Sequence, residues 1–312
     1  MNFKVGIDIG GTFTDIIAVS EKGNAFVHKI LSTSHDPSIG FVDGLYKISD
    51  TVGIDFDKFI KSIDTIVHGT TVATNALLTL QGAKTALITT RGFRDALEMR
   101  RGIREEQYNN HYRNVIPLVP RYLRFTVDER IDSEGNILSK PDKKQLLPII
   151  KKIEAEKVEA IAICFMNSYK NSINEKIAVE YLRSQLPRIF TIASFEVLPS
   201  IRFYERVSTT VVSAFVGPIV SNYLDNLNSK LRDLKYNGSL LIMQSNGGVV
   251  TPEIVKHNPA VTVLSGPAAA PTAGVYYANF LGYNNCITVD MGGTSFDASL
   301  VTGNNCATSS EG

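Results

Sequence analysis

The stretch FKVGIDIGGTFTDIIAV, residues 3–19, decides the fold class of this 312-residue chain. Residues 3–9 form a short β-rich run, and residues 13–19 resume a β-branched pattern after Gly10-Gly11-Thr12. Two such runs on either side of a Gly-Gly turn predict a β-hairpin. A dinucleotide-binding loop would instead lead from a strand into a helix, so the pattern argues against that kind of site.

The same pattern returns near the end of the printed sequence. DIGGTFTD at residues 8–15 and DMGGTSFD at residues 290–297 share Asp, Gly, Gly, Thr and Asp at the same offsets. Both stretches lie between β-rich runs. A chain that carries one strand-turn-strand unit twice is expected to form two structurally related lobes that face each other.

These turns have the chemistry of a phosphate clamp. Glycines let the backbone approach a ligand closely and present N–H groups to it. Asp8 and Asp290 stand at strand ends, where Mg²⁺ would take their oxygens and keep several waters, and Asp15 and Asp297 would orient the turns or those waters. One such turn is equally consistent with a plain tight hairpin, whereas two matched copies favour the clamp. The candidate phosphate ligands are Gly10, Gly11, Thr12 and Thr14 in the first copy and Gly292, Gly293, Thr294 and Ser295 in the second.

The segment between the two copies alternates strands and helices. We expect strands at 65–69, 84–90, 160–165 and 190–198, helices at 70–80, 93–100, 142–157 and 172–186, and a hairpin over 125–140. This alternation predicts α/β layers with a largely parallel sheet.

The pattern changes near residue 197, where we place the boundary between a domain of residues 1–196 and a domain of residues 197–312. A long helical stretch follows at 202–235, and Pro218 is expected to split or kink it because proline removes a backbone hydrogen bond. Beyond it we expect strands at 239–244, 261–264 and 286–290, and a helix that begins at Gly266-Pro267.

Composition and charge narrow the class of protein. The net charge of +1, from 32 Lys and Arg against 31 Asp and Glu, shows no footprint for a nucleic-acid partner. No uninterrupted apolar run reaches the roughly 18 residues of a membrane span, and no signal-peptide pattern opens the chain. Cys164, Cys286 and Cys306 are odd in number and far apart, which argues against disulfides and a cysteine zinc site. We therefore expect a cytoplasmic enzyme or binding protein.

These residues carry a resemblance. The two turns are similar to the phosphate loops of the sugar-kinase/Hsp70/actin ATPase superfamily, and the chain resembles the ATP-binding A subunit of the hydantoinase/oxoprolinase family from end to end. The matching stretches are GIDIGGTFTD (6–15), HGTTVATNALL (68–78), TTRGFRDALEMRRG (89–102), VPRYLRFTVDERID (119–132), LPSIRFYERVSTTVVSAFVGP (198–218), MQSNGGV (243–249), LSGPAA (264–269) and DMGGTSFD (290–297).

The resemblance implies an α/β, ribonuclease-H-like fold in two lobes, the second incomplete, with ATP and Mg²⁺ between them. It implies an enzyme subunit that phosphorylates a lactam or imide carbonyl oxygen before the ring is opened, commonly with a B-type partner subunit and with homo-oligomerisation. The alternative is the ATP-using subunit of an acetone- or acetophenone-type carboxylase. A non-enzymatic nucleotide switch and an inactive fragment also stay open.

The resemblance implies roles for residues outside the turns. Gly266 would begin a helix that approaches the nucleotide, and His68, at a strand end before a helix N-terminus, would bind substrate or transfer a proton. A structural role for His68 is equally consistent with the sequence. The arginines of residues 91–104 crowd one segment with glutamates at 98, 105 and 106, and mixed charges of this kind are typical of a solvated helix face. The alternative is that Arg101, beside Gly102, reaches a phosphate or an anionic substrate.

The sequence departs from the family in two ways. Members of this type run to about twice this length, and this chain ends about fifteen residues after the second loop, before the motif that holds adenosine in the superfamily. We therefore expect either a fragment or a protein completed by a second polypeptide, which alone would bind nucleotide poorly and be inactive. The smaller departure is Ala270-Pro271, where a glycine is commoner in the family.

Overall fold

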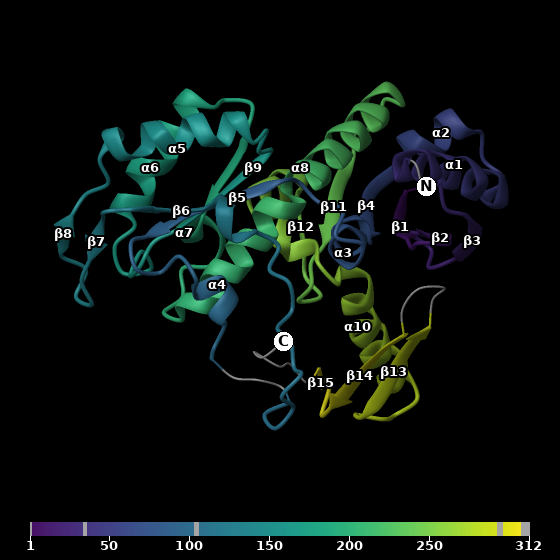
Figure 1. Cartoon of the computed structure of the whole chain (residues 1–312). Helices are drawn as coiled ribbons and strands as arrows, with labels where there is room; N and C mark the ends of the chain where they lie inside the picture. Colours follow the sequence, from purple (N-terminus) through teal and green to yellow (C-terminus); the bar gives the residue numbers. More distant parts are fainter. Residues whose placement is uncertain (1, 34–35, 103–105, 292–295, 307–312) are drawn as a thin grey trace. The chain divides into compact units, whose positions relative to one another are not determined.

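The computed structural model of the chain describes residues 2–33, 36–102, 106–291 and 296–306, apart from the side chain of Pro267. The chain folds into two compact units that interleave along the sequence (Figure 1). Unit 1 consists of Met1–Leu78, Val220–Lys256 and Val261–Gly312, and unit 2 consists of Thr79–Ile219 and His257–Ala260.

Unit 1 is built on a six-stranded mixed sheet with the strand order β12-β11-β4-β1-β2-β3. Its strands are β1 (Phe3–Ile9), β2 (Phe13–Ser20), β3 (Ala25–Leu31), β4 (Ile63–Thr70), β11 (Ser239–Met243) and β12 (Val249–Val250). β1, β2 and β3 form an antiparallel meander, and β4 and β11 run parallel to β1. The predicted hairpin of residues 3–19 is confirmed.

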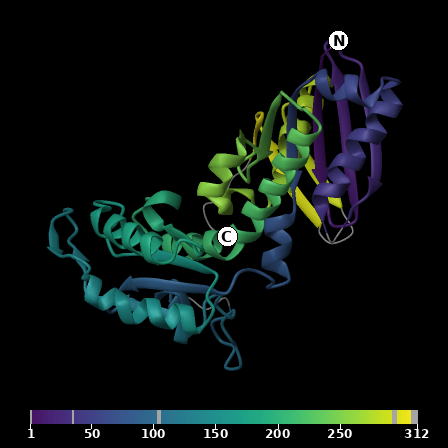
Figure 2. The same ribbon diagram turned by 90° about the horizontal axis from the view of Figure 1, so that it is seen from above.

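The alternation along β1 gives the sheet two different faces. Phe3, Val5 and Ile7 are buried beneath helix α1 (Pro37–Val52), while Gly6 and Asp8 face the opposite side. Asp36 caps α1 by accepting a hydrogen bond from the backbone N–H of Ser38, and helix α2 (Phe56–Lys61) follows. Figure 2 shows α1 beside the β1–β3 strands. The other face is therefore left open beside Asp8.

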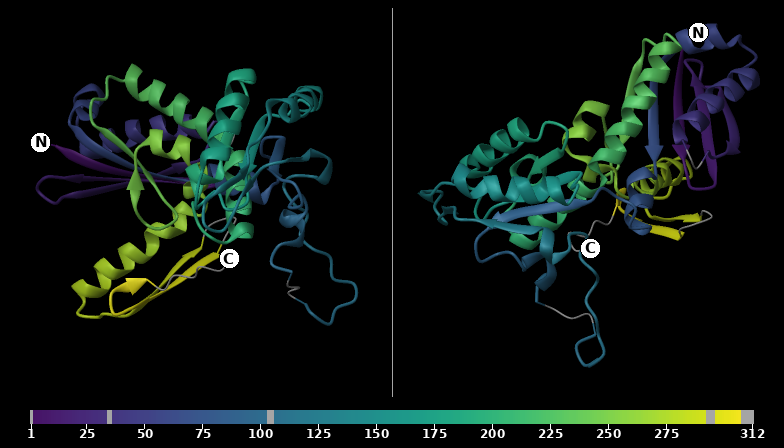
Figure 3. Two further views of the ribbon diagram at one scale, coloured as in Figure 1. Left: turned by 90° about the vertical axis from the view of Figure 1, so that its left-hand side faces the viewer. Right: turned by 45° about the horizontal axis from the view of Figure 1, so that its top comes forward.

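The remaining elements of unit 1 come from the end of the chain and the segment after β4. They are α3 (Val72–Leu78), α9 (Pro252–His257), α10 (Ser265–Phe280), β13 (Cys286–Met291), β14 (Phe296–Thr302) and β15 (Asn305–Cys306). β13, β14 and β15 form an antiparallel sheet, and α10 lies along it (Figure 3). Gly274 permits this close approach, because a Cβ atom there would lie 2.3 Å from Cγ2 of Thr288.

Unit 2 contains a four-stranded parallel sheet with the order β10-β9-β5-β6. Its strands are β5 (Thr85–Thr90), β6 (Arg124–Val127), β9 (Ala160–Cys164) and β10 (Phe190–Ala193). Helices α5 (Lys143–Ala155) and α6 (Ile173–Gln185) lie above this sheet in Figure 1, and the start of α8 lies below it. β5 and β9 are buried along their whole length, as expected for strands covered on both faces. The predicted parallel α/β layer is confirmed.

Several predicted elements differ from the observed ones. The helix predicted at 93–100 contracts to α4 (Ala96–Met99), and the strand predicted at 190–198 ends early and turns into α7 (Ser194–Val197). The hairpin predicted over 125–140 is formed by β7 (Arg130–Ile131) and β8 (Ile137–Ser139), because β6 joins the parallel sheet after η1 (Arg121–Leu123). The strand predicted at 261–264 was wrong: the chain forms a short 3₁₀ helix, η2 (Pro259–Thr262).

Helix α8 (Phe203–Asp233) is continuous through Pro218, so the predicted split there does not occur. It is the one helix among the described residues that is long and apolar enough to cross a membrane. The sequence had not indicated it, because polar residues interrupt its apolar run. Most of its apolar stretch is buried inside the protein, as in a core helix. Buried packing along both halves holds the residues on either side of the proline in one helix.

The predicted boundary near residue 197 does not coincide with the limits of the compact units. The chain leaves unit 1 after α3 and returns to it within α8, so unit 2 is an insertion. Both aspartate-flanked hairpins consequently lie in unit 1, although the predicted domains 1–196 and 197–312 placed one in each. A linear change of pattern cannot reveal such an insertion, because the return point falls inside a helix.

Candidate functional site

The first hairpin places two carboxylates opposite each other. Asp8 on β1 pairs with Asp15 on β2, and the backbone N–H of Gly10 donates to the carbonyl of Phe13 at 3.0 Å to close the turn. Gly11 and Thr12 are exposed at the tip of the turn. Their backbone N–H groups are thus accessible to an anionic ligand.

Thr14 does not share that position. Its side chain is fully buried and its hydroxyl lies 3.0 Å from the hydroxyl of Ser32. The period of two along β2 turns Thr14 toward the α1 face, away from Asp8 and Asp15. The prediction that the Thr14 hydroxyl binds phosphate is therefore wrong for this arrangement, and the side chain is part of the core.

The second hairpin repeats the register of the first. β13 and β14 pair in antiparallel fashion with Asp290 opposite Asp297, as Asp8 stands opposite Asp15. The predicted phosphate ligands Gly292, Gly293, Thr294 and Ser295 lie outside the described residues. The sequence repeat is therefore also a repeat of strand pairing on both sides of the turn.

Asp8 lies in a crowded environment although water reaches its carboxylate. A Cβ atom on Gly69 would lie 2.6 Å from Oδ1 of Asp8, and one on Gly266 would lie 3.9 Å from the same oxygen. Surrounding protein atoms and the charges of Asp15 and Asp290 raise the pKa of Asp8, while Lys29 lowers it. A bound cation would relieve this repulsion, so the carboxylate suits a cation ligand.

Asp15 has an ion-pair partner within the described residues. Nζ of Lys29 on β3 lies 2.6 and 2.8 Å from the two carboxylate oxygens of Asp15, with both side chains about half exposed. An exposed pair of this kind adds little stability, but it neutralises Asp15 locally. Among the described residues, the carboxylate of the first hairpin that makes no ion pair is therefore that of Asp8, which Lys29 influences only at longer range.

The N-terminus of α10 lies beside Asp8. Ser265 is buried and its hydroxyl donates to the carbonyl of Thr70 at 3.2 Å, which ties the start of the helix to the end of β4. Leu264 occupies the N-cap position with a φ of 59° and makes no side-chain cap. The first turn of α10, with Gly266, is thus a position where backbone N–H groups favour an anion.

A pocket of about 300 Å³ opens beside these groups within unit 1. Asp8 and Asp15 line it, and its other lining residues are Gly6, Ile7, Ile16, Ile17, Val27, Val67, Gly69, Met243, Ser265, Gly266 and Ala269. This apolar lining was not predicted from the sequence. Its only signal was the open side of the β1–β2 alternation, and the residues from β3, β4 and β11 join it through strand register.

Metal ligation would have to rest on few protein groups. The described part of the chain holds no group of three or more His, Cys, Asp and Glu residues arranged to hold a metal ion. Mg²⁺ differs from zinc in this respect, because it is commonly bound by one or two carboxylates, substrate phosphates and waters. Asp8, with Asp290 close enough to raise its pKa, fits that donor set.

His68 lies in the core of unit 1 and not in the pocket. Its Nδ1 is 3.1 Å from the carbonyl oxygen of Ile7, and its Nε2 is 2.7 Å from the hydroxyl of Tyr223 on α8. Burial lowers the pKa of His68 to about 4, so the ring is neutral at pH 7. The arrangement supports the structural alternative, and the predicted substrate or proton-transfer role for His68 is not supported.

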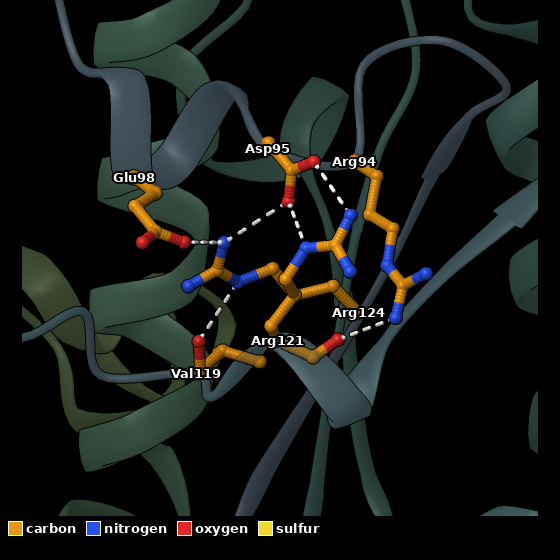
Figure 4. Close-up of polar contacts among 6 residues, drawn as sticks. All are labelled: Arg94, Asp95, Glu98, Val119, Arg121 and Arg124. Atoms are coloured by element: carbon orange, nitrogen blue, oxygen red, sulfur yellow. Dashed lines mark hydrogen bonds and ion pairs between the residues drawn. The ribbon is translucent and has the colours of Figure 1, made fainter.

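The charged residues of the segment 91–102 are bound within unit 2: Arg91 pairs with Asp128 at 2.6 Å, and the acidic residues of the segment pair with arginines that follow it. The Arg121 guanidinium binds Asp95 at 2.9 and 3.0 Å, and the buried Arg124 binds Glu98 at 2.8 Å (Figure 4). Arg94 donates to the carbonyl of Arg121 at 2.9 Å. These contacts pair opposite charges and connect α4 to the start of β6.

Arg101, the residue predicted to reach an anion, donates from Nε to Glu205 at 2.8 Å. This pair favours the structural alternative for the segment, and Arg104 lies outside the described residues. The predicted contact of Arg101 with a phosphate would require the ion pair with Glu205 to open.

Comparison with known proteins identifies the family. The model of the hydantoinase/oxoprolinase N-terminal region matches residues 4–186, and the hydantoinase/oxoprolinase model matches residues 206–312. The chain belongs to the hydantoinase/oxoprolinase family. The resemblance seen in the sequence is thereby confirmed.

Relatives in this family include enzyme subunits of two kinds. The chain is 38% identical to the caprolactamase subunit alpha of Pseudomonas jessenii over 96% of its length and 44% of the relative's. It is 34% identical to the acetophenone carboxylase gamma subunit of Aromatoleum aromaticum, over 96% of this chain and 42% of that subunit. The chain therefore spans less than half the length of these relatives.

Solved structures agree with the fold. The crystal structure of the ATP-dependent caprolactamase from Pseudomonas jessenii matches with a TM-score of 0.86 and 38% identity, over 95% of this chain and 43% of that one. A nucleotide-free structure of acetone carboxylase matches with a TM-score of 0.88 and 27% identity, over 97% and 44%. The mixed α/β fold is thus shared with both.

Proposed function

We propose that this chain is the ATP-using part of an enzyme that phosphorylates the carbonyl oxygen of a cyclic amide and so prepares the ring for opening. The observation that carries the proposal is the pair of in-register hairpins in unit 1. The negative charge of Asp290 in the second hairpin raises the pKa of Asp8 in the first, and Asp8 lines a pocket. Support also comes from the caprolactamase of Pseudomonas jessenii, which is ATP-dependent.

Each residue of the first hairpin has a role in this proposal. Asp8 and Asp290 hold Mg²⁺ directly or through water, and the backbone of Gly10, Gly11 and Thr12 binds phosphate oxygens. The N-terminus of α10 at Gly266 stabilises the same negative charge. Bound Mg²⁺ supplies neutralisation of the charge that develops on the transferred phosphoryl group. Asp15, held by Lys29, orients the turn.

The reaction balances as a phosphoryl transfer followed by hydrolysis. The bond from the γ-phosphorus to the bridging oxygen of ATP breaks, ADP leaves with the electron pair, and a new bond forms from phosphorus to the amide oxygen. The amide N–H loses its proton, so the ring becomes an O-phosphorylated imidate. Two waters are then consumed in opening the ring and releasing phosphate. Phosphorylation helps because it makes the imidate carbon electrophilic enough for the first water to add. The C–N bond then breaks as the ring nitrogen takes a proton, and the second water hydrolyses the resulting acyl phosphate to a carboxylate and phosphate.

The proposal includes the fold type and a partner. A meander extended by parallel strands, together with a repeated hairpin, supports the two-lobed, ribonuclease-H-like type that the sequence implied. The relatives are named as subunits, alpha in one case and gamma in another, which supports a B-type partner subunit here. Ring opening would then be completed with that subunit.

A carboxylase subunit is the second candidate, because the acetophenone carboxylase subunit and the acetone carboxylase structure match almost the whole chain. The two functions differ in the co-substrate that each requires. Phosphate release from ATP should be measured with the assembled enzyme and Mg²⁺, with caprolactam, hydantoin, 5-oxoproline, or acetone plus bicarbonate offered separately. Lactam-stimulated release with ring opening supports the hydrolase, and stimulation only by ketone with bicarbonate supports the carboxylase. Stimulation by none of them would contradict both.

A further inference from the structure

Ser32, directly after β3, holds two carbonyl groups of the first turn. Its hydroxyl donates to the carbonyl of Gly10 at 2.8 Å, and its backbone N–H donates to the carbonyl of Thr12 at 2.9 Å. The hydroxyl of Thr14 lies 3.0 Å from that of Ser32. Because a carbonyl can only accept, the Ser32 proton goes to Gly10, and Thr14 must then donate to Ser32. We call Thr14 and Ser32 the hydroxyl pair, and this pair ends on the carbonyl of Gly10.

The hydroxyl pair fixes the orientation of the peptide group between Gly10 and Gly11. With a glycine on each side, this peptide group could turn over at little steric cost. The pair approaches it from the α1 face, because Thr14 is buried on that side of β2. In a trans peptide the N–H points away from the carbonyl, so the Gly11 N–H points away from the α1 face, as the side chain of Asp8 does.

The N–H groups at the tip of the turn remain available to a ligand. Within the part of the chain that the structure describes, the backbone N–H groups of Gly11 and Thr12 make no hydrogen bond, and both residues are exposed. The carbonyls of the turn are thus anchored while its donors stay open. Donors that are held in place before an anion arrives need no rearrangement when it binds.

The second hairpin lacks the hydroxyl pair. DMGGTSFD places Phe296 at the offset that Thr14 occupies in DIGGTFTD. Phe296 has no hydroxyl and is 64% exposed, whereas Thr14 is fully buried. The strands of the second hairpin nevertheless pair in the same register as those of the first. Strand pairing therefore does not require the hydroxyl pair, which is an added feature of the first turn.

We infer that Ser32 is a positioning residue for phosphate binding, which locks the Gly10–Gly11 peptide group so that the Gly11 N–H is directed at a phosphate oxygen. Thr14 holds the Ser32 hydroxyl in place and so acts on the site without touching the ligand. The inference rests on the proposed function and adds two residues to its phosphate site. Loss of the Ser32 hydroxyl should accordingly weaken anion binding beyond any effect on the stability of the fold.

The test uses magnesium pyrophosphate, which carries the phosphate chemistry of ATP without the adenosine. Its dissociation constant for the full chain is measured by NMR titration, from the shift of the Gly11 amide resonance. Ser32→Ala removes the hydroxyl, Ser32→Thr keeps one, and Thr14→Val removes the donor behind it. Ser62→Ala is the matched control, because Ser62 is also half-buried and its hydroxyl donates to the carbonyl of Phe59 at 2.7 Å, at the opposite end of β1 from the turn.

The expected result is a loss of affinity of about tenfold in Ser32→Ala, the size of one hydrogen bond to a charged group. Ser32→Thr should stay within about threefold of the wild type. Thr14→Val should weaken binding by about threefold alone and add no further loss to Ser32→Ala, because it acts through Ser32. Ser32→Ala and Ser62→Ala should lower the melting temperature by similar amounts, yet only Ser32→Ala should lose affinity.

Wild-type affinity in Ser32→Ala, or equal losses of affinity in Ser32→Ala and Ser62→Ala, would overturn the inference and leave the proposed function intact. A wild-type Gly11 resonance that does not respond to magnesium pyrophosphate would contradict both. If the affinities follow the expectation but the assembled enzyme releases no phosphate with any lactam or ketone, the proposed function fails while the positioning role of Ser32 stands.

Discussion

Asp8 is the residue on which the proposed chemistry depends, and its surroundings make it unfavourable in the free protein. Crowding by protein atoms and repulsion from Asp15 and Asp290 raise its pKa, so the fold favours the protonated form. Stability linked to this group is present at low pH and is lost as the pH rises through the folded-state pKa. At pH 7 the ionised Asp8 therefore lowers the free energy of unfolding unless a cation is bound.

The first prediction follows from the raised pKa of Asp8. Asp8→Asn should raise the melting temperature at pH 7 in the absence of Mg²⁺, because it removes an unfavourable charge. In the assembled enzyme, Mg²⁺ with ATP should raise the melting temperature of the wild type and leave that of the variant unchanged. Differential scanning calorimetry tests both expectations, with Asp43→Asn on the exposed side of α1 as the control. A lower melting temperature for Asp8→Asn than for Asp43→Asn would contradict the assignment.

Gly69 gives a second prediction, because its backbone lies close to the carboxylate of Asp8. Gly69→Ala would bring a methyl group to 2.6 Å from Oδ1 of Asp8 and force the carboxylate to move. We expect this change to weaken Mg²⁺-dependent ATP binding by at least about tenfold, as measured by isothermal titration calorimetry. In the double variant with Asp8→Asn, Gly69→Ala should add no further loss, because its effect passes through Asp8. Additive losses would show that Gly69 acts in another way.

The lowered pKa of His68 should make the stability of the protein depend on pH. Its pKa falls from 6.5 to about 4 on folding because the ring is buried. The unfolded chain therefore binds more protons between these values, and stability is lost as the pH falls from 6.5 toward 4. The loss amounts to about 3 kcal/mol for this group. Urea unfolding should show about 2 kcal/mol of this loss between pH 7 and pH 5 for the wild type, and His68→Gln should flatten the dependence. An unchanged slope in the variant would contradict the buried neutral ring.

At the scale of elements, a buried glutamate fixes the ends of the unit 2 strands. Glu175 on α6 accepts hydrogen bonds from the backbone N–H groups of Phe165 and Phe195 at 2.7 and 2.9 Å, and from the hydroxyl of Ser194 at 2.6 Å. It thus joins the segment after β9 to the first residues of α7. Burial raises the pKa of Glu175, which shows how enclosed the carboxyl is.

Removal of this carboxyl should destabilise unit 2. Glu175→Ala leaves buried N–H groups unpaired, and each costs about 1–3 kcal/mol, so we expect a loss of about 3 kcal/mol or more in urea unfolding. Glu180→Ala, on the exposed face of the same helix, should change stability by less than about 0.5 kcal/mol. Similar losses for the two variants would mean that the Glu175 contacts contribute little.

Elements with a strong local pattern could be predicted from the sequence, and elements set by tertiary contacts could not. The Gly10-Gly11 turn between alternating runs and the apolar run at 160–165 gave β1, β2 and β9 correctly. The end of β10 is set instead by Glu196, whose side chain accepts from the backbone N–H of Ala193 and starts α7. The backbone of Val261 accepts from Ser245 in place of pairing as a strand.

The candidate site divides in the same way. Asp8, Asp15 and the turn between them follow from residue types at fixed offsets, so the sequence was sufficient. Ile17 and Val67 reach the same pocket only through the register of β2 and β4 against β1. No local pattern contains that register, and the pocket therefore had to come from the structure.

At the scale of the whole molecule, the chain is an interleaved pair of units that carries both hairpins in one of them. Unit 2 enters after α3 and returns the chain within α8, so the two hairpins are separated by an α/β insertion in sequence while they share a unit in space. The chain matches less than half of its relatives' length. The proposed activity is accordingly a proposal for an assembled enzyme and not for these residues alone.

The central claim is that the aspartate-flanked hairpins bind ATP and Mg²⁺ for transfer of phosphate to an amide oxygen. The most direct test is phosphate release by the assembled enzyme with and without a neutral lactam, compared between the wild type, Asp8→Asn and Asp43→Asn. We predict lactam-stimulated release in the wild type and Asp43→Asn, and a loss of at least about 100-fold in Asp8→Asn. Wild-type release by Asp8→Asn would contradict the claim.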